Sequence, residues 1–241
     1  MLDIQNLHVL VEKKEVVRGL DLKLQLGEVQ VIMGPNGSGK STFANALAGH
    51  PKYTITDGKI IVDGDDITTA TPEKRAKAGL FLSMQYTPDV PGVTIANFLR
   101  VAYNAKQGSN VNPLQFRKVL LEKIQELKLD ESVLARYLNV CFSGGEKKRL
   151  EILQLAVLEP KYAILDETDS GLDVDALKIV AAGVNKFRAQ DKGVLLITHY
   201  NRLLEFIVPD VVHIMIDGKI VAHGGKELAQ QIEQDGYASY T

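Results

Sequence analysis

The stretch VQVIMGPNGSGKSTFANAL, from Val29 to Leu47, joins a short apolar run to a glycine-rich turn and then to a segment with helical spacing. Four residues in it have the spacing G-x-x-x-x-G-K-[ST]: Gly34, Gly39, Lys40 and Ser41. A strand before this spacing and a helix after it are the context of a phosphate-binding loop. The stretch therefore predicts that the chain binds a nucleoside triphosphate.

Each residue type in the loop has a chemical reason. Glycines let backbone N–H groups turn inward around a phosphate, and the amino end of the following helix adds partial positive charge. Lys40 would reach the β and γ phosphates, and the Ser41 hydroxyl would ligate Mg²⁺. We expect ATP and Mg²⁺ at the following residues: Gly34, Pro35, Asn36, Gly37, Ser38, Gly39, Lys40, Ser41 and Thr42.

Composition narrows the class of protein. With 241 residues, 45% of them hydrophobic, the chain is long enough for one large domain that carries an inserted subdomain. The net charge of −2 provides no overall basic surface for nucleic acid. No apolar run reaches the roughly 18 residues of a membrane-spanning helix, which predicts a cytoplasmic chain without direct membrane insertion.

The single cysteine, Cys141, excludes an internal disulfide, and a small buried packing role is the ordinary expectation for it.

Short alternating and apolar runs predict a strand-rich chain. Residues 2–11 and 16–26 alternate as half-buried strands do, with a turn at 13–14, which predicts an antiparallel start. Further strands are expected at 29–33, 58–66, 79–84, 162–166 and 194–198, and a hairpin at 211–216 and 219–223 across Asp217-Gly218.

The middle of the chain has a different character. A short polar helix is expected at 72–78, and the prolines between Tyr86 and Val93 predict a loop. Residues 95–140 have a helical pattern, with one helix opening near Pro113. These observations favour an inserted helical subdomain, while a continuous alternating α/β arrangement stays open.

A second glycine-containing motif, FSGGEKKR, spans Phe142–Arg149. Ser143 and Glu146 have the spacing of a capping box, which predicts a helix start. The two glycines between them favour a place where the backbone approaches another group closely. The motif is therefore either a helix cap alone or, in addition, a second helix start that faces phosphate.

Polar groups follow two predicted buried strands. Asp166 and Glu167 end the apolar run 162–166, and adjacent acids at such a place are costly unless they bind a cation or act in chemistry. Asp166 would bind Mg²⁺ and Glu167 would polarise the attacking water, whereas a solvated turn is the plain alternative. His199 follows the strand at 194–198, at the edge where α/β sheets bind ligands, although a lone histidine is more often structural.

Taken in order, these landmarks resemble those of the ATP-binding-cassette (ABC) ATPases over essentially the whole chain. The matches are Gly34–Ser41 to the Walker A loop, Gln85 to the glutamine loop, Ser143–Glu146 to the signature, Asp166-Glu167 to Walker B, Ser170–Asp173 to the D-loop and His199 to the switch histidine. One departure is Val11, which stands near the place where many cassettes have an aromatic residue against adenine.

The resemblance implies the fold and its division. The expected class is α/β, a single ABC ATPase domain over 1–241 with a RecA-like mixed sheet core, an N-terminal antiparallel β subdomain and an inserted helical subdomain. The nucleotide-binding core would comprise residues 1–86 and 156–241. The helical subdomain with the signature motif would comprise residues 87–155.

The resemblance also implies a site shared by two copies. In this family two cassettes face head to tail, and ATP on one Walker A loop meets the signature of the other, so a transient dimer is expected. The implied catalytic residues are Glu167 as base with His199, Gln85 and Lys40. The implied Mg²⁺ ligands are Ser41, Gln85 and Asp166, and the residues supplied in trans are Ser143, Gly144, Gly145 and Asp173.

Within the family, the chain closely resembles the SufC-type ATPases of the cytosolic SUF iron–sulfur cluster assembly system. It is carried by Thr168 in DETDSGLD, by EKKRLEILQLAVLEP after the signature, by MQYTPDVPGV around Gln85 and by THYNRLL after His199. It implies SufB- and SufD-type scaffold proteins as partners, moved by ATP-dependent cassette dimerisation. One cysteine cannot itself hold a cluster that needs about four thiolates.

Three other functions are compatible with parts of this pattern. The ATP-binding subunit of a membrane ABC transporter would have the same ATPase cassette, but Thr168 and the segment after the signature disfavour this function. A nucleic-acid or ribosome-associated cassette is disfavoured by the single cassette and the slightly acidic charge. A module that senses ATP without hydrolysis would lack the catalytic acid, whereas Glu167 is present.

Overall fold

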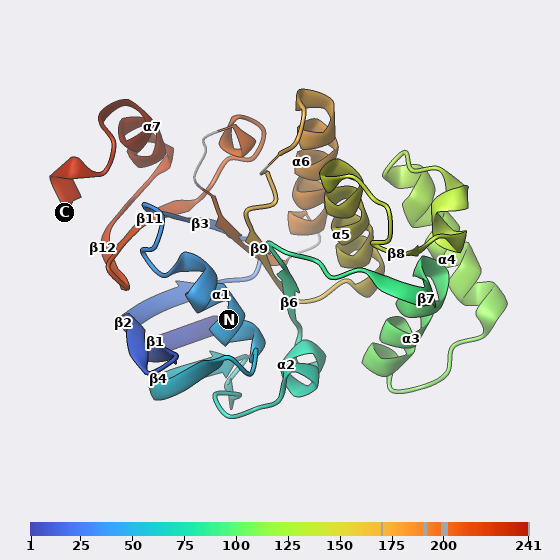
Figure 1. Cartoon of the computed structure of the whole chain (residues 1–241), viewed down its shortest axis with the longest axis horizontal. Coiled ribbons are helices and arrows are strands. Elements are labelled where there is room, and N and C mark those ends of the chain that lie inside the picture. The colour runs from blue at the N-terminus through green and yellow to red at the C-terminus, as the bar shows by residue number, and fades with distance from the viewer. Residues whose placement is uncertain (170, 190–191, 199–201, 241) are drawn as a thin grey trace. The chain divides into compact units, whose positions relative to one another are not determined.

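The computed structural model describes residues 1–169, 171–189, 192–198 and 202–240 (Figure 1). It contains two compact units. The first comprises Met1–Gln85, Pro160–Asp169 and Arg188–Thr241, and the second comprises Tyr86–Glu159 and Ser170–Phe187. The sequence-based division differs because it placed residues 86, 156–159 and 170–187 in the nucleotide-binding core. As a statement about domains it stays a proposal.

The first unit contains, in its described residues, a six-stranded sheet of order β12-β11-β3-β10-β9-β6. Its strands are β3 (Val29–Met33), β6 (Leu80–Ser83), β9 (Tyr162–Asp166), β10 (Gly193–Ile197), β11 (Val211–Ile216) and β12 (Lys219–Gly224). Only the β11–β12 pairing is antiparallel. Every residue of β3, β9 and β10 is buried, which explains why these strands are continuous apolar runs without alternation.

The same unit contains an antiparallel sheet of order β2-β1-β4-β5. These strands are β1 (Leu2–Val11), β2 (Lys14–Leu24), β4 (Tyr53–Val62) and β5 (Asp65–Asp66). The predicted antiparallel start is confirmed, whereas β4 begins five residues before the predicted strand because the alternating YTIT segment extends it. The unit also includes the helices α1 (Lys40–Ala48), α2 (Pro72–Ala78), α7 (Lys226–Asp235), η2 (Leu203–Glu205) and η3 (Ala238–Tyr240).

One apolar core joins the two sheets to α1. Leu2 and Ile4 of β1, Ile32 of β3 and Phe43 and Leu47 of α1 belong to one cluster of buried side chains. Burying side chains of this size stabilises the folded state by about 1.5–3 kcal/mol each. The helix that follows the glycine loop is therefore held by apolar packing on both sheets.

The second unit is mainly helical. Its elements are β7 (Val90–Thr94), α3 (Ile95–Gln107), α4 (Pro113–Glu126), η1 (Glu131–Ala135), β8 (Tyr137–Leu138), α5 (Gly144–Leu158) and α6 (Val174–Arg188), the last of which ends in the first unit. Two predictions were wrong in detail. The loop expected up to Val93 contains β7, and the helical pattern expected up to 140 includes β8, which pairs with β7 over too few residues to leave a periodic signal.

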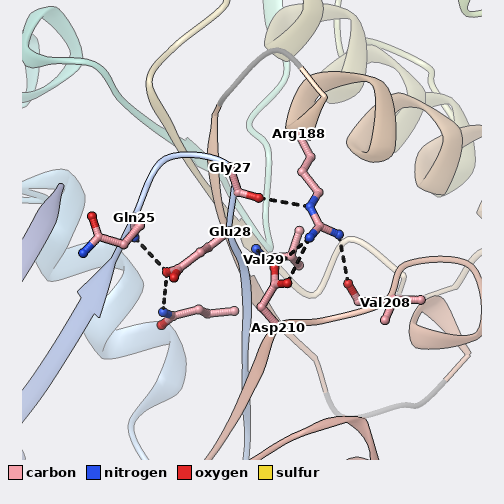
Figure 2. Close-up of polar contacts among 8 residues, drawn as sticks. Gln25, Gly27, Glu28, Val29, Arg188, Val208 and Asp210 are labelled. Carbon is pink, nitrogen blue, oxygen red and sulfur yellow. Dashed lines mark hydrogen bonds and ion pairs between the residues drawn. The ribbon is translucent and has the colours of Figure 1, made fainter.

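Arg188 fixes the amino ends of two core strands (Figure 2). Its guanidinium donates to the Gly27 carbonyl at 3.1 Å, to the Val208 carbonyl at 3.2 Å and to both carboxylate oxygens of Asp210 at 3.0 and 2.9 Å. The same Asp210 carboxylate accepts from the Val29 N–H at 2.8 Å. Bidentate pairing of this kind sets geometry as well as attraction. The starts of β3 and β11 are thereby held in register at the edge opposite the glycine loop.

Arg75 of α2 occupies the carboxyl end of α1. It is 3% exposed, and its guanidinium donates to the carbonyls of Ala46 at 2.6 Å and Leu47 at 2.9 Å. It also donates to the carbonyls of Ala70 at 2.9 Å and Thr68 at 2.6 Å. The last carbonyls of a helix have no partner within the helix. One buried side chain therefore satisfies the end of α1 and the chain that leads into α2.

Replacing Arg75 is expected to destabilise the first unit. Arg75→Met keeps much of the apolar stem but removes the donor to four carbonyls, of which that of Ala46 still accepts from the Gly49 N–H, and this should lower the free energy of unfolding by about 3 kcal/mol. Chemical denaturation followed by circular dichroism measures the change. Lys77→Met, an exposed change on the same helix, is the control and should stay within about 0.5 kcal/mol of the wild type. Equal stabilities for the two variants would contradict the role of Arg75.

Candidate nucleotide site

The glycine loop lies between β3 and α1, and Lys40 is folded back onto it. The Lys40 ammonium is 4% exposed and donates to the carbonyls of Gly34 at 2.8 Å and Pro35 at 2.9 Å. Burial lowers its pKa to about 8, against the opposing effect of Glu167 and Asp166, whose carboxylates raise it. The ammonium also lies 3.5 Å from the Ser38 hydroxyl oxygen. A buried cation held by uncharged groups is a good partner for an anion such as a phosphate.

The loop glycines are required for different reasons. A Cβ on Gly34 would lie 2.1 Å from the Met215 carbonyl oxygen, so only glycine allows β11 to approach this closely. Gly39, which precedes the first residue of α1, has φ of 106°. Gly37 has φ of 81°, and apart from its chain neighbours no atom of the described residues lies within 4 Å of the place where its Cβ would be. The loop is therefore fixed against β11 at its start and open at its centre.

The predicted carboxylate pair ends β9. Asp166 is 1% exposed, and Glu167 has φ of 50°, a left-handed conformation that is uncommon for a residue with a side chain. The Glu167 N–H donates to the Ile197 carbonyl at 2.8 Å, which ties the turn to β10. The Gln85 side-chain amide donates to the Glu167 carboxylate at 2.6 Å. Two residues that are 82 positions apart, and that the sequence assigned to one site, are thus in direct contact.

The neighbouring strand β10 supplies the next contact. The Thr198 hydroxyl donates to the Asp169 carboxylate at 2.6 Å, and the Thr198 N–H approaches the Ile32 carbonyl at 3.3 Å. The carboxyl ends of β3, β9 and β10 therefore meet at the edge that carries the glycine loop, as expected for ligand sites of parallel sheets. His199, predicted at this edge, lies outside the described residues.

The signature motif lies in the second unit, at the start of α5. The Ser143 hydroxyl accepts from the Glu146 N–H at 3.2 Å, and the Glu146 carboxylate accepts from the Ser143 N–H at 2.8 Å, so the predicted capping box is confirmed. This amide and Arg136 hold the pKa of Glu146 at about 2. No atom of the described chain would contact a Cβ on Gly144, and a Cβ on Gly145 would meet only Leu172, at 3.8 Å. Packing within this chain therefore does not require either glycine.

Two other predicted residues in this unit have identifiable surroundings. The Asp173 carboxylate accepts from the Ala176 N–H at 2.7 Å and so caps the start of α6. Cys141 is exposed and has φ of 57°, so the buried packing role expected for a lone cysteine was wrong. Its neighbour explains this placement, because Phe142 is buried instead and lies under the Arg136 guanidinium at 3.6 Å from the ring centroid.

The candidate metal ligands suit Mg²⁺. Across the described residues no group of three or more histidine, cysteine, aspartate or glutamate side chains could hold a metal ion. The predicted set of a Ser41 hydroxyl, a Gln85 amide oxygen and an Asp166 carboxylate offers oxygen atoms only, which is what Mg²⁺ prefers when phosphates complete its shell. Gln85 uses its nitrogen toward Glu167, so its oxygen is the atom suited to a metal.

The contribution of the β11–β12 turn to the site was not predicted from the sequence. The predicted turn across Asp217-Gly218 is confirmed, and the Gly218 N–H donates to the Ser38 carbonyl at 2.9 Å. Gly218 has φ of 83°, and a Cβ there would lie 2.0 Å from the Val16 carbonyl oxygen. The Asp-Gly pair indicates a hairpin, but nothing in the sequence indicates that the hairpin holds the glycine loop.

Comparison with known proteins agrees with this geometry. Residues 17–170 match the family described as ABC transporter. A Bacillus subtilis (strain 168) protein named Vegetative protein 296 is 52% identical over 98% of this chain and 91% of that protein. A Streptococcus pyogenes (serotype M18) protein named Probable ABC transporter ATP-binding protein is 52% identical over 99% of this chain and 94% of that protein.

A solved structure described as the ATP binding subunit of an ABC transporter has a TM-score of 0.81 at 25% identity, and it covers 98% of this chain and 93% of that one. The predicted fold class is thereby confirmed. No helix in the described part of the chain is both long and apolar enough to cross a membrane. With its family match over residues 17–170, the chain belongs to the ABC transporter family, as an ATP-hydrolysing cassette that uses ATP and Mg²⁺.

Proposed function

We propose that this cassette is the cytoplasmic motor subunit of a SUF-type iron–sulfur cluster assembly scaffold. The single observation that carries the proposal is Thr168, which follows the catalytic carboxylate in DETDSGLD. Thr168 is 2% exposed, so the residue that distinguishes this chain from the transporter pattern belongs to the packed site and not to a variable surface. The segment EKKRLEILQLAVLEP after the signature supports the same subfamily.

The proposed chemistry is attack of water on the γ-phosphate. The Lys40 ammonium exchanges the Gly34 and Pro35 carbonyls for phosphate oxygens, which satisfies its buried charge better. Glu167 accepts the proton of the attacking water, and Gln85 holds that carboxylate in orientation. Mg²⁺ would be held by Ser41, Gln85 and Asp166 and would neutralise charge on the β and γ phosphates. His199 is proposed to position the γ-phosphate.

The site is proposed to be completed by a second copy of the chain. Ser143, Gly144, Gly145 and Asp173 of one copy would then meet the ATP held by residues 34–42 of the other. The absence of any described neighbour around a Cβ at Gly144 supports this assignment, because a phosphate needs that space. Closure and reopening of such a dimer would move the partner proteins attached to it.

Replacing the catalytic carboxylate should stop turnover and preserve binding. Glu167→Gln removes the proton acceptor while keeping size and polarity, so we expect hydrolysis to fall by about 10²–10⁴-fold and the Kd of Mg-ATP to change by less than about threefold. Phosphate release and titration calorimetry measure the two quantities. The slow variant should also accumulate an ATP-dependent dimer, visible by analytical ultracentrifugation.

Glu205→Gln is the matched control, because Glu205 is an exposed carboxylate of the same unit outside the site. It should hydrolyse ATP at the wild-type rate. If Glu167→Gln hydrolysed ATP as fast as this control, Glu167 would not be the base.

Nucleotide affinity should fall with rising pH through the pKa of Lys40. That pKa is lowered to about 8 in the nucleotide-free site, and bound phosphate would raise it again. Below about pH 8 the ammonium is charged and attracts phosphate, whereas above it the affinity should drop by up to about tenfold per pH unit. Calorimetry between pH 7 and pH 9.5 measures this. Lys40→Met should bind weakly and show no such step, and a wild-type affinity that is constant to pH 9.5 would refute the assignment.

The helical unit presents apolar side chains that suit a partner. Tyr86 is 80% exposed, Leu114 is 79% exposed and Val101 is 58% exposed. Exposed apolar side chains are the kind of surface that a bound partner covers. We propose that SufB- and SufD-type scaffold proteins bind near residues 86–93 and the helical insert.

Partner capture tests the subfamily directly. The tagged chain, recovered from its own cell lysate without detergent, should retain two mutually similar scaffold proteins in stoichiometric amounts, identified by mass. Tyr86→Ser should reduce this recovery at least about threefold and leave ATP binding intact, since a buried interface tyrosine contributes more than a rim residue. Leu26→Ser, an exposed apolar residue of the first unit, is the control.

A second candidate function has its own observation. The Streptococcus pyogenes relative is named as a probable ABC transporter ATP-binding protein. If the chain were recovered only with a detergent-solubilised membrane protein, it would be the ATP-binding subunit of such a transporter, and the assembly role would be wrong.

A further inference from the structure

The carboxyl-terminal segment of the chain reaches the glycine loop at two places. The first is the Gly218 N–H, which donates to the Ser38 carbonyl at 2.9 Å. The second is Tyr237, which follows α7 by two residues and whose hydroxyl oxygen is buried. The backbone of Gly34, the first residue of the loop, acts on this hydroxyl and lowers its pKa, whereas burial raises it by more.

The Tyr237 hydroxyl is a costly group in this conformation. It has no aligned hydrogen-bond partner among the described residues, even though the Gly34 backbone lies near it. A buried hydroxyl without a partner costs free energy, and such groups in folded proteins call for an explanation. Most tyrosines that only pack against a core reach water or a backbone acceptor with their hydroxyl.

Nucleotide binding changes the surroundings of Gly34. In this conformation Lys40 donates to the carbonyls of Gly34 and Pro35, and a phosphate would compete with both for its ammonium. Each carbonyl that Lys40 exchanges for a phosphate oxygen loses a charge-assisted hydrogen bond. On one side, Gly34 packs so closely against β11 that a Cβ there would lie 2.1 Å from the Met215 carbonyl oxygen. The Gly34 backbone also acts on the buried hydroxyl of Tyr237.

We propose that Tyr237 is a positioning residue of the nucleotide site. Its hydroxyl closes a hydrogen bond with the Gly34 backbone once Lys40 has moved onto the phosphates, and so it stabilises the nucleotide-bound form of the loop. The carboxyl-terminal tail is then part of the ATP site. The proposal rests on ATP binding by the cassette and does not depend on the identity of its partners.

Removing the hydroxyl separates this role from ordinary packing. Tyr237→Phe keeps the ring, so in the full chain we expect the Kd values of Mg-ATP and Mg-ADP to rise about three- to tenfold, the size of one lost hydrogen bond. The melting temperature without nucleotide should stay the same or rise, since the variant lacks the unpartnered group. The rise in melting temperature on adding Mg-ATP should be smaller than in the wild type.

Tyr240→Phe is the matched control, because it removes a tyrosine hydroxyl from the same tail. It should bind both nucleotides within twofold of the wild type. The proposal is overturned if Tyr237→Phe also binds within twofold, or if it melts lower without nucleotide while keeping the full nucleotide-induced rise, which would be a structural role alone. The assay uses no partner protein, so its result is separate from that of the partner capture.

Discussion

The buried ammonium of Lys40 is the constraint on which the rest of the site depends. A cation that is almost wholly removed from water is unfavourable unless polar groups replace the lost hydration. Here the carbonyls of Gly34 and Pro35 do so, and they can face the ammonium only because the loop turns sharply around Gly37 and Gly39. The glycines, the lysine and the loop conformation therefore depend on one another. A phosphate offers the ammonium a stronger partner than two carbonyls, which gives the loop a chemical reason to bind a nucleotide.

The fold holds this loop from several sides. Phe43 and Leu47 of α1 are buried in the core shared by the two sheets, and Arg188 fixes the opposite ends of β3 and β11. The parallel arrangement of β3, β9 and β10 places Asp166 and Glu167 at the edge where the loop lies. The packing of α1, the contacts of Arg188 and the parallel strands are all rigid. Few side chains therefore need to change partners when a nucleotide binds.

Local features of the site could be predicted from the sequence. The glycine loop, the carboxylates at the end of β9 and the capping box of Ser143 and Glu146 depend on residues that are close in sequence, so spacing alone revealed them. The meeting of Gln85 with Glu167 could be predicted through the family resemblance. Other contacts between distant segments could not, because no local pattern encodes them. Nothing in the sequence distinguishes Arg75 from an ordinary cation on a helix, and yet it is buried at the end of another helix. The same applies to Gly218 and Tyr237, and to the short pairing of β7 with β8.

Arg75 also has an electrostatic consequence for α1. A helix has a positive amino end and a negative carboxyl end, and nearby charges of opposite sign weaken the field of each. The first turn of α1 has no acidic residue, whereas the carbonyls near its last turn are bonded to the buried guanidinium of Arg75. The negative end is therefore neutralised and the positive end is not. With its carboxyl end neutralised, α1 directs the positive potential of its amino end at the place where phosphate would bind, beside the Asp166 and Glu167 carboxylates that act on Lys40.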